Sequence, residues 1–233
     1  MRLRRKAADE TAADETAVAD AGATPGGAAD APDAAAEDTP GAAGAGTAED
    51  GPWDIDDLPD DGVARLDLGS LLVAPVADRE LRVQVDEKSG AVRAVLLATE
   101  AGALELRAFA APRNGDLWSD IRPQIAADAA RRGGTATERE GRFGTELVCE
   151  VRMTRADGQT GTQTSRVIGI NGPRWLLRAT FLGEPARDPE SAAEWESAIA
   201  QVAVRRGAHA MPVGEQLPLN LPDGAQPKAV PAS

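Results

Sequence analysis

Several short segments of this 233-residue chain alternate strictly between apolar and polar side chains. Residues 80–86 (ELRVQVD) and 103–110 (ALELRAFA) show the pattern clearly. A repeat of two residues places successive side chains on opposite faces of a β-strand. One apolar face and one polar face are typical of an antiparallel sheet that is covered on one side only. These segments therefore predict an antiparallel sheet as the core of the fold.

The segment 171–183 (NGPRWLLRATFLG) continues this pattern after a turn. Its predicted core-facing row consists of Trp175, Leu177, Ala179 and Phe181. The opposite, solvent-facing row consists of Arg174, Leu176, Arg178 and Thr180. A two-residue turn at Asn171–Gly172 needs the N–H of residue 173, which proline lacks. We therefore predict a longer turn with Gly172 at positive φ, and a strand that begins at Pro173.

A first helix is predicted between residues 116 and 133. Either Asp116 or Ser119 can cap its start, and Gly133 can end it. Pro123 fits only if the helix begins at Ser119, because proline is accepted in the first turn. The predicted apolar stripe consists of Trp118, Ile121, Ile125 and Ala129.

A second helix is predicted from Asp188 as N-cap and Pro189 as its first residue. Its predicted apolar stripe consists of Ala192, Trp195, Ile199 and Val202. Arg205, Arg206 and Gly207 suit its C-terminal end. The order of strands, helix, strands, helix predicts an α+β fold, a twisted antiparallel sheet with two helices packed on one face. This single domain is expected over residues 62–212.

The formal charge of -13 belongs mainly to the first part of the chain. Residues 7–61 hold sixteen acidic residues and no Lys or Arg. Without these, and without the four basic residues of 1–6, 22 acidic residues face 21 basic ones. Residues 1–61 have no bulky apolar stripe, so a disordered acidic leader is predicted. It would act as a solubilising tail or attract a basic partner. Residues 213–233 are expected to form an extended, proline-rich tail.

The sequence does not favour an enzyme, a metal site or a cofactor. The only histidine, His209, follows the last helix, and Cys149 lies on the apolar side of its strand. One Cys and one His do not make a metal site, and no phosphate-binding glycine motif joins a strand to a helix. The carboxylate pairs Glu138/Glu140 and Glu146/Glu150 are expected on solvent faces. No apolar run is long enough to span a membrane, so a cytoplasmic protein is expected.

Arginines near two Pro-Arg turns form the first candidate site. Arg113, Arg174 and Arg178, with Trp118 close to the first turn, would bind an anion or a partner if the turns lie together. The alternative is a set of scattered surface arginines.

The C-terminal tail holds the second candidate site. Gln216, Leu217, Leu219 and Leu221 in EQLPLNLP have a spacing similar to peptides that dock on the bacterial sliding clamp. The alternative is that these leucines fasten the tail to the body of the same chain.

The segments RLDLGSLLVAP, AFAAPRNGDLW, EGRFGTEL, GPRWLLRATFLG and RRGAHAMP resemble an actinobacterial family known as domain of unknown function 3710. The resemblance covers about residues 50–222. It implies an actinobacterial cytoplasmic protein with a variable acidic leader, and it supplies no activity, cofactor or catalytic residue. Family members tend to be encoded near deoxyuridine-triphosphate hydrolase and a small OB-type protein, which tilts the expectation slightly toward nucleic-acid maintenance.

Two functions follow as hypotheses. The first is a non-catalytic binding or assembly module with an unknown protein partner, without direct nucleic-acid binding. The second is a DNA-maintenance accessory recruited through the C-terminal peptide. An exposed sheet edge would also allow pairing with a second copy of the chain.

Overall fold

The computed structural model describes residues 51–86, 89–113, 115–154 and 159–221. The first fifty residues of the predicted disordered leader lie outside these ranges, as do residues 222–233 of the predicted proline-rich tail. No helix within the described ranges is long and apolar enough to cross a membrane.

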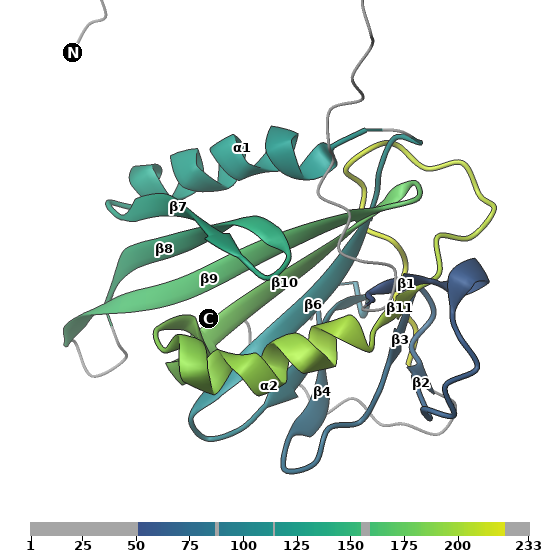
Figure 1. Cartoon of the computed structure of the whole chain (residues 1–233). Coiled ribbons are helices and arrows are strands. Elements are labelled where there is room, and N and C mark those ends of the chain that lie inside the picture. Colours follow the sequence, from purple (N-terminus) through teal and green to yellow (C-terminus); the bar gives the residue numbers. More distant parts are fainter. Residues whose placement is uncertain (1–50, 87–88, 114, 155–158, 222–233) are drawn as a thin grey trace, which may run out of the picture. The chain divides into compact units, whose positions relative to one another are not determined.

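A seven-stranded sheet in which every neighbouring pair is antiparallel forms the centre of the fold (Figure 1). In spatial order its strands are β4 (Glu80–Val85), β5 (Val92–Ala98), β6 (Gly102–Ala110), β10 (Trp175–Gly183), β9 (Thr160–Gly172), β8 (Gly144–Thr154) and β7 (Thr135–Gly141). The predicted antiparallel sheet is therefore confirmed, and the alternating segments 80–86, 103–110 and 174–181 all lie within it or at its ends.

A second, small sheet lies beside the first. Its strands, in spatial order, are β1 (Trp53–Asp54), β11 (Ala203–Val204), β3 (Leu71–Val73) and β2 (Leu66–Asp67). The short helix η1 (Ile55–Asp57) follows β1. The side chain of Asp54 accepts a hydrogen bond from Trp175 Nε1 at 2.7 Å, which links β1 to the large sheet.

Helix α1 (Leu117–Arg131) begins where Asp116 caps it, by accepting a hydrogen bond from the N–H of Ser119. Of the two predicted caps, Asp116 is confirmed, and the start at Ser119 that would place Pro123 in the first turn is wrong, because Pro123 lies inside the helix. The carbonyl of Ser119 therefore lacks its usual helical donor. The predicted end is confirmed, because Gly133 follows the helix with φ of 73°.

Helix α2 (Pro189–Ala200) begins as predicted, since the Asp188 side chain accepts from the N–H groups of Glu190 and Ser191. Its predicted end near Arg205 is wrong, because the helix stops at Ala200. The next residues form β11, which pairs with β1 and β3. Residues 203–204, which were predicted to belong to the last helical turn, pair as a short strand instead.

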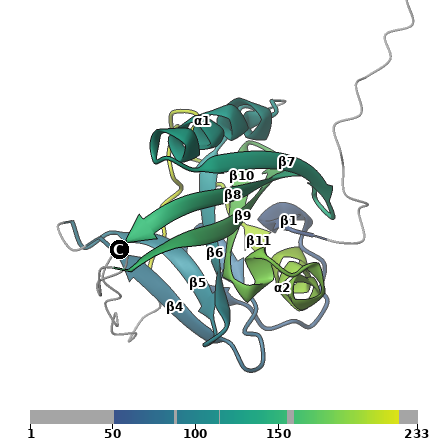
Figure 2. The same ribbon diagram turned by 90° about the vertical axis from the view of Figure 1, so that its left-hand side faces the viewer.

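The two helices lie on opposite faces of the large sheet, so the prediction that both pack on one face is wrong (Figures 1 and 2). Helix α2 packs through Trp195 and Ile199 on the face that holds Leu177 and Phe181. Helix α1 packs on the other face, over β7, β8 and β9. Adding a Cβ atom to Gly169 would place it 2.1 Å from the ring of Trp118, so this glycine allows α1 to approach β9 closely.

Consecutive apolar residues in the central strands explain the second covered face. Trp175, Leu176 and Leu177 are all buried, although Leu176 was expected on the solvent face. The neighbouring Val167 and Ile168 of β9 also point to opposite faces, and each joins a different core. Continuous apolar runs of this kind are typical of strands that are buried on both sides.

The β9–β10 turn also differs from its prediction. Strand β9 continues through Gly172, and Pro173 and Arg174 form the turn, with Arg174 rather than Gly172 at positive φ (62°). Proline followed by a residue at positive φ is the pattern of a type II turn. The Arg174 carbonyl accepts hydrogen bonds from the N–H of Ala111 and from Arg206 Nε, which hold the turn in place.

Candidate functional site

Helix α1 covers only part of its face of the large sheet, and strands β4, β5, β6 and β10 continue that face beyond it (Figure 2). Cross-strand pairing aligns polar side chains along this uncovered part. Arg178 of β10 lies directly opposite Arg107 of β6, and Thr180 lies opposite Glu105. The alternation of β6 that puts Leu104 and Leu106 in the core under α2 turns Glu105, Arg107 and Phe109 to this side.

Arg178 is the most unusual of these side chains. Its guanidinium lies over the ring of Phe109, 5.1 Å from the ring centroid. Its Nε is buried without a hydrogen-bond partner, and among the described residues no carboxylate forms an ion pair with it. Burial lowers the pKa of the Arg178 guanidinium and repulsion from Arg107 lowers it further, whereas attraction to Glu105 partly offsets these effects. A half-buried cation without an anion is costly, since desolvation is not compensated.

The neighbouring arginines on this face have acidic or amide partners. Arg107 pairs with Glu105 at 2.8 Å, and its second terminal nitrogen donates to Gln84 at 3.2 Å. Arg82 of β4 pairs with Glu80, which raises the pKa of the Arg82 guanidinium. Arg178 is therefore the member of this row that forms no ion pair with a described carboxylate, and Glu105 offsets its charge only without direct contact.

A groove of about 210 Å³ runs between α1 and strand β10, and Arg178 lines it. We call this the arginine groove, and its polar lining consists of Asp128, Arg132, Ser165, Arg178 and Thr180. Asp128 pairs with Arg131, whereas Arg132 forms no ion pair within the described part of the chain. The charge that the groove presents is thus net positive, and an anionic group would satisfy its free guanidinium groups.

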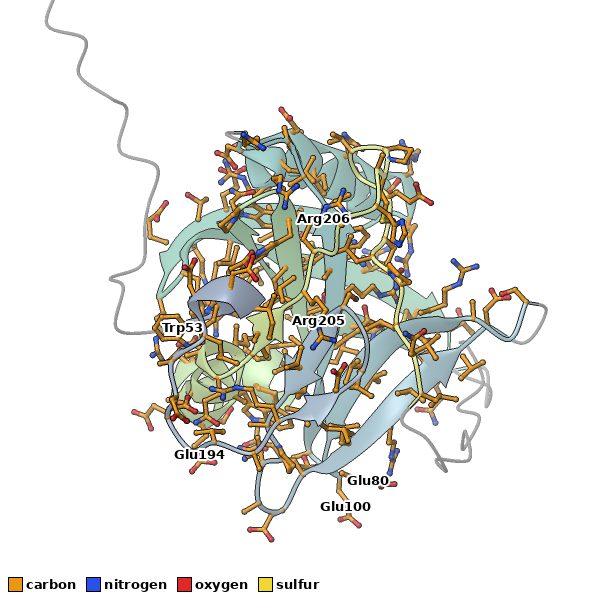
Figure 3. The ribbon with its side chains drawn as sticks, turned by 90° about the vertical axis from the view of Figure 1, so that its right-hand side faces the viewer. Trp53, Glu80, Glu100, Glu194, Arg205 and Arg206 are labelled. Carbon is orange, nitrogen blue, oxygen red and sulfur yellow. The ribbon has the colours of Figure 1, made fainter. Side chains whose placement is uncertain are left out.

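The predicted anion site around the two Pro-Arg turns is divided in the structure. The turn of Arg174 and the segment of Arg113 do lie together, because the Ala111 N–H donates to the Arg174 carbonyl at 2.9 Å. Arg206, which follows β11 (Figure 3), donates to the same carbonyl. Arg174 precedes β10, whereas Arg178 lies on the uncovered sheet face.

Trp118 belongs to the core rather than to an accessible site. Its side chain is buried between α1, to which it belongs, and the large sheet. Its indole Nε1 donates to the carbonyl of Thr145 at 2.6 Å. Its role in the described fold is to fasten α1 to the sheet.

The C-terminal segment packs on the body of its own chain. The backbone of Leu217 donates to the Ala108 carbonyl, while Gln216 Nε2 donates to the Arg93 carbonyl at 2.6 Å. Leu217 and Leu219 are buried in the core under α2, and Leu221 is half-buried. This placement favours the alternative in which the tail is fastened to the body. Docking on another protein would require the loss of two buried leucines, at about 1.5–3 kcal/mol each.

A buried ionic cluster lies on the α2 face and includes a residue that was expected in solvent. Glu146 is only 1% exposed, so its predicted solvent position is wrong. It accepts a hydrogen bond from Arg166 Nε at 2.7 Å and another from Arg139. Arg166 also pairs with Glu196 of α2. Position 146 lies opposite Arg139 across the β7–β8 pair, so cross-strand charge pairing was a signal for this cluster.

Cys149 and His209 have the surroundings that the sequence indicates. Cys149 is buried between α1 and the sheet, and burial raises the pKa of its thiol. His209 is exposed beyond β11. No group of three His, Cys, Asp or Glu side chains in the described residues could hold a metal ion.

Comparison with known proteins gives a family and a weak likeness to a solved structure. No curated protein sequence matches this chain. The solution structure of cyanobacterial PsbP (CyanoP) from Synechocystis sp. PCC 6803 is similar at 14% identity, over 63% of this chain and 96% of that chain, with a TM-score of 0.34. A likeness this weak carries no conclusion about fold or function. The family model described as "Protein of unknown function (DUF3710)" matches residues 51–228, and the chain therefore belongs to that family.

Proposed function

We propose that this protein is a non-catalytic binding module that engages an anionic group of a partner protein in the arginine groove. The observation that carries the proposal is the guanidinium of Arg178, which is half-buried on Phe109 and forms no ion pair with a carboxylate of the described residues. A buried charge without a counter-ion reduces the stability of a fold. A bound carboxylate would supply the missing charge and accept from the free N–H groups.

The surroundings of Arg178 support binding rather than catalysis. The groove offers guanidinium and hydroxyl donors from Arg132, Arg178, Ser165 and Thr180. Its one thiol, Cys149, is buried, and burial raises the pKa of that thiol, which disfavours the reactive thiolate. The one carboxylate in its lining, Asp128, is paired with Arg131, so the groove offers mainly donors, which suit recognition of an anion.

Titration of a fluorescent tetraglutamate peptide into the full chain tests this function. We expect Arg178→Gln to weaken binding on the order of tenfold, because a hydrogen bond to a charged group contributes about 1.5–3 kcal/mol. Raising the salt concentration should weaken binding to the unaltered chain more than binding to the variant. Unchanged affinity in Arg178→Gln would remove the proposal.

The matched control tests the turn arginines. Arg113→Gln combined with Arg174→Gln removes two exposed guanidinium groups near the β9–β10 turn. We expect this double variant to bind the peptide within twofold of the unaltered chain. A loss in the double variant together with full binding in Arg178→Gln would move the site to the turns.

A further inference from the structure

Strand β9 is longer than strand β10 at one end, and this leaves part of its edge unpaired (Figure 1). Residues 160–167 of β9 pair with β8, but pairing with β10 stops at Ser165, opposite Leu182. Within the described residues, no other backbone segment pairs with 160–164 on the β10 side. The exposed edge therefore presents free N–H and C=O groups that a further strand would complete.

The backbone of β10 turns away at this point for a local reason. Gly183 has φ of 79°, and the next residues form the short helix η2 (Glu184–Ala186). A Cβ atom at position 183 would lie 2.4 Å from the carbonyl oxygen of Ala101, so only glycine fits this bend. The bend leaves a notch of about 690 Å³ beside residues 161–164.

Two arginines line the notch without a carboxylate partner among the described residues. Arg132 caps the C-terminal end of α1, and it also lines the arginine groove. Arg187 follows η2 and leads into α2, and its Nε donates only to the Gly183 carbonyl at 3.3 Å. Glu105, the acidic residue that lines the notch, is already paired with Arg107.

The two arginines come from elements on opposite faces of the sheet, since α1 and α2 lie on opposite faces. Successive side chains of an added strand would also point to opposite faces. Two adjacent acidic residues in an extended segment would therefore meet Arg132 and Arg187, one on each side. On the neighbouring strand β8, the exposed residues Glu150 and Arg152 lie opposite Thr164 and Thr162 of β9. Their opposite charges cancel, so β8 adds no net charge beside the notch.

We infer that the notch binds an acidic segment of a partner protein as an extended strand that pairs with residues 160–164 of β9. The inference rests on the proposed function, and it adds the conformation of the bound segment and the place where it lies. Main-chain hydrogen bonds to the free edge provide affinity in this mode, and the side chains provide specificity. Specificity here is for adjacent acidic residues.

The test uses the full chain and a labelled peptide, acetyl-Val-Thr-Asp-Glu-Thr-Val-amide. We expect this peptide to bind at least tenfold more tightly than its Asn-Gln counterpart. Arg132→Glu combined with Arg187→Glu should weaken binding by tenfold or more. Arg113→Glu combined with Arg174→Glu is the matched control, and it should change affinity less than twofold. Equal losses in both double variants would indicate a general charge effect and overturn the inference.

A second peptide tests strand pairing itself. N-methylation of alternate amides removes donors and keeps the charge, so it should abolish binding. On binding of the first peptide, the amide signals of residues 161–164 should shift and exchange more slowly. Equal binding of the N-methylated peptide would overturn the inference. If the tetraglutamate peptide still depended on Arg178 in that case, the proposed function would stand without it.

Discussion

Two arginines of this protein lie over phenylalanine rings at the same distance but in opposite electrostatic surroundings. Arg166 on the α2 face lies 5.1 Å from the centroid of Phe181, and Arg178 on the α1 face lies 5.1 Å from that of Phe109. Arg166 pairs with Glu146 and Glu196, and these hydrogen bonds outweigh burial and raise the pKa of its guanidinium. Burial lowers the pKa of Arg178, which has no such partner.

The difference separates an arginine that holds the fold together from one that is available to a ligand. Around Arg166, charges from β7, β8, β9 and α2 neutralise one another inside the molecule. Around Arg178 the described residues leave a positive charge on a face that remains partly open. An uncompensated charge beside a groove is a recognised indication of a functional site.

The largest effect is expected from Arg166→Met. This change leaves the buried carboxylate of Glu146 with only Arg139, so the free energy of unfolding should fall by about 3–5 kcal/mol. Urea denaturation followed by tryptophan fluorescence measures the loss. Combining Arg166→Met with Glu146→Leu should recover at least half of it, because the unpaired charge is gone. A loss below about 1 kcal/mol in the single variant would mean that the cluster does not stabilise the fold.

A smaller effect of opposite sign is expected from Arg178→Met. Removing a half-buried, unpaired guanidinium should leave the free energy of unfolding unchanged or raise it by about 1 kcal/mol, since the desolvation cost disappears while apolar contact with Phe109 remains. The same denaturation experiment applies. Destabilisation as large as that of Arg166→Met would show that Arg178 also stabilises the fold. It would contradict the distinction between a structural Arg166 and an Arg178 that is available to a ligand.

The smallest effect is expected from Glu105→Gln, which releases Arg107 from its ion pair. Arg107 lies opposite Arg178, so the sheet face beside the groove would then hold two neighbouring guanidinium groups without an ion pair. Affinity for the tetraglutamate peptide should rise by roughly twofold to fivefold, the range of a surface ion pair. Glu100→Gln, on the exposed β5–β6 turn (Figure 3), is the neutral control. A fall in affinity would place Glu105 among the ligand contacts.

Alternation and capping made much of the fold predictable from sequence. The strand segments, the Asp188 cap and the stripe from Trp118 to Ala129 appear as expected. The arrangement of the helices was not predictable from one row of alternation. The runs at 175–177 and 167–168 carried the information, but strict alternation over 174–181 predicts only one apolar face. Local periodicity identifies a strand and leaves open what covers its second face.

The candidate site was predictable only in part, for a different physical reason. Arg178 was correctly placed on the side opposite the Trp175 row, yet its pairing with Arg107 depends on strand register across 71 positions of the chain. Arg132 and Arg187 come from the ends of separate elements, and their convergence depends on where β10 stops. No spacing in the sequence predicts that these two arginines line the same notch.

The seating of residues 214–219 has a consequence for biosynthesis. This segment forms backbone hydrogen bonds with β6 and contributes Leu217 and Leu219 to the core, so a nascent chain cannot complete its main core until residues 214–219 have been synthesised. Chains cut short by a premature stop would leave apolar surface uncovered beside β6. Proteases would have access to this surface in such products, whereas chains that include residues 214–219 would cover it with Leu217 and Leu219.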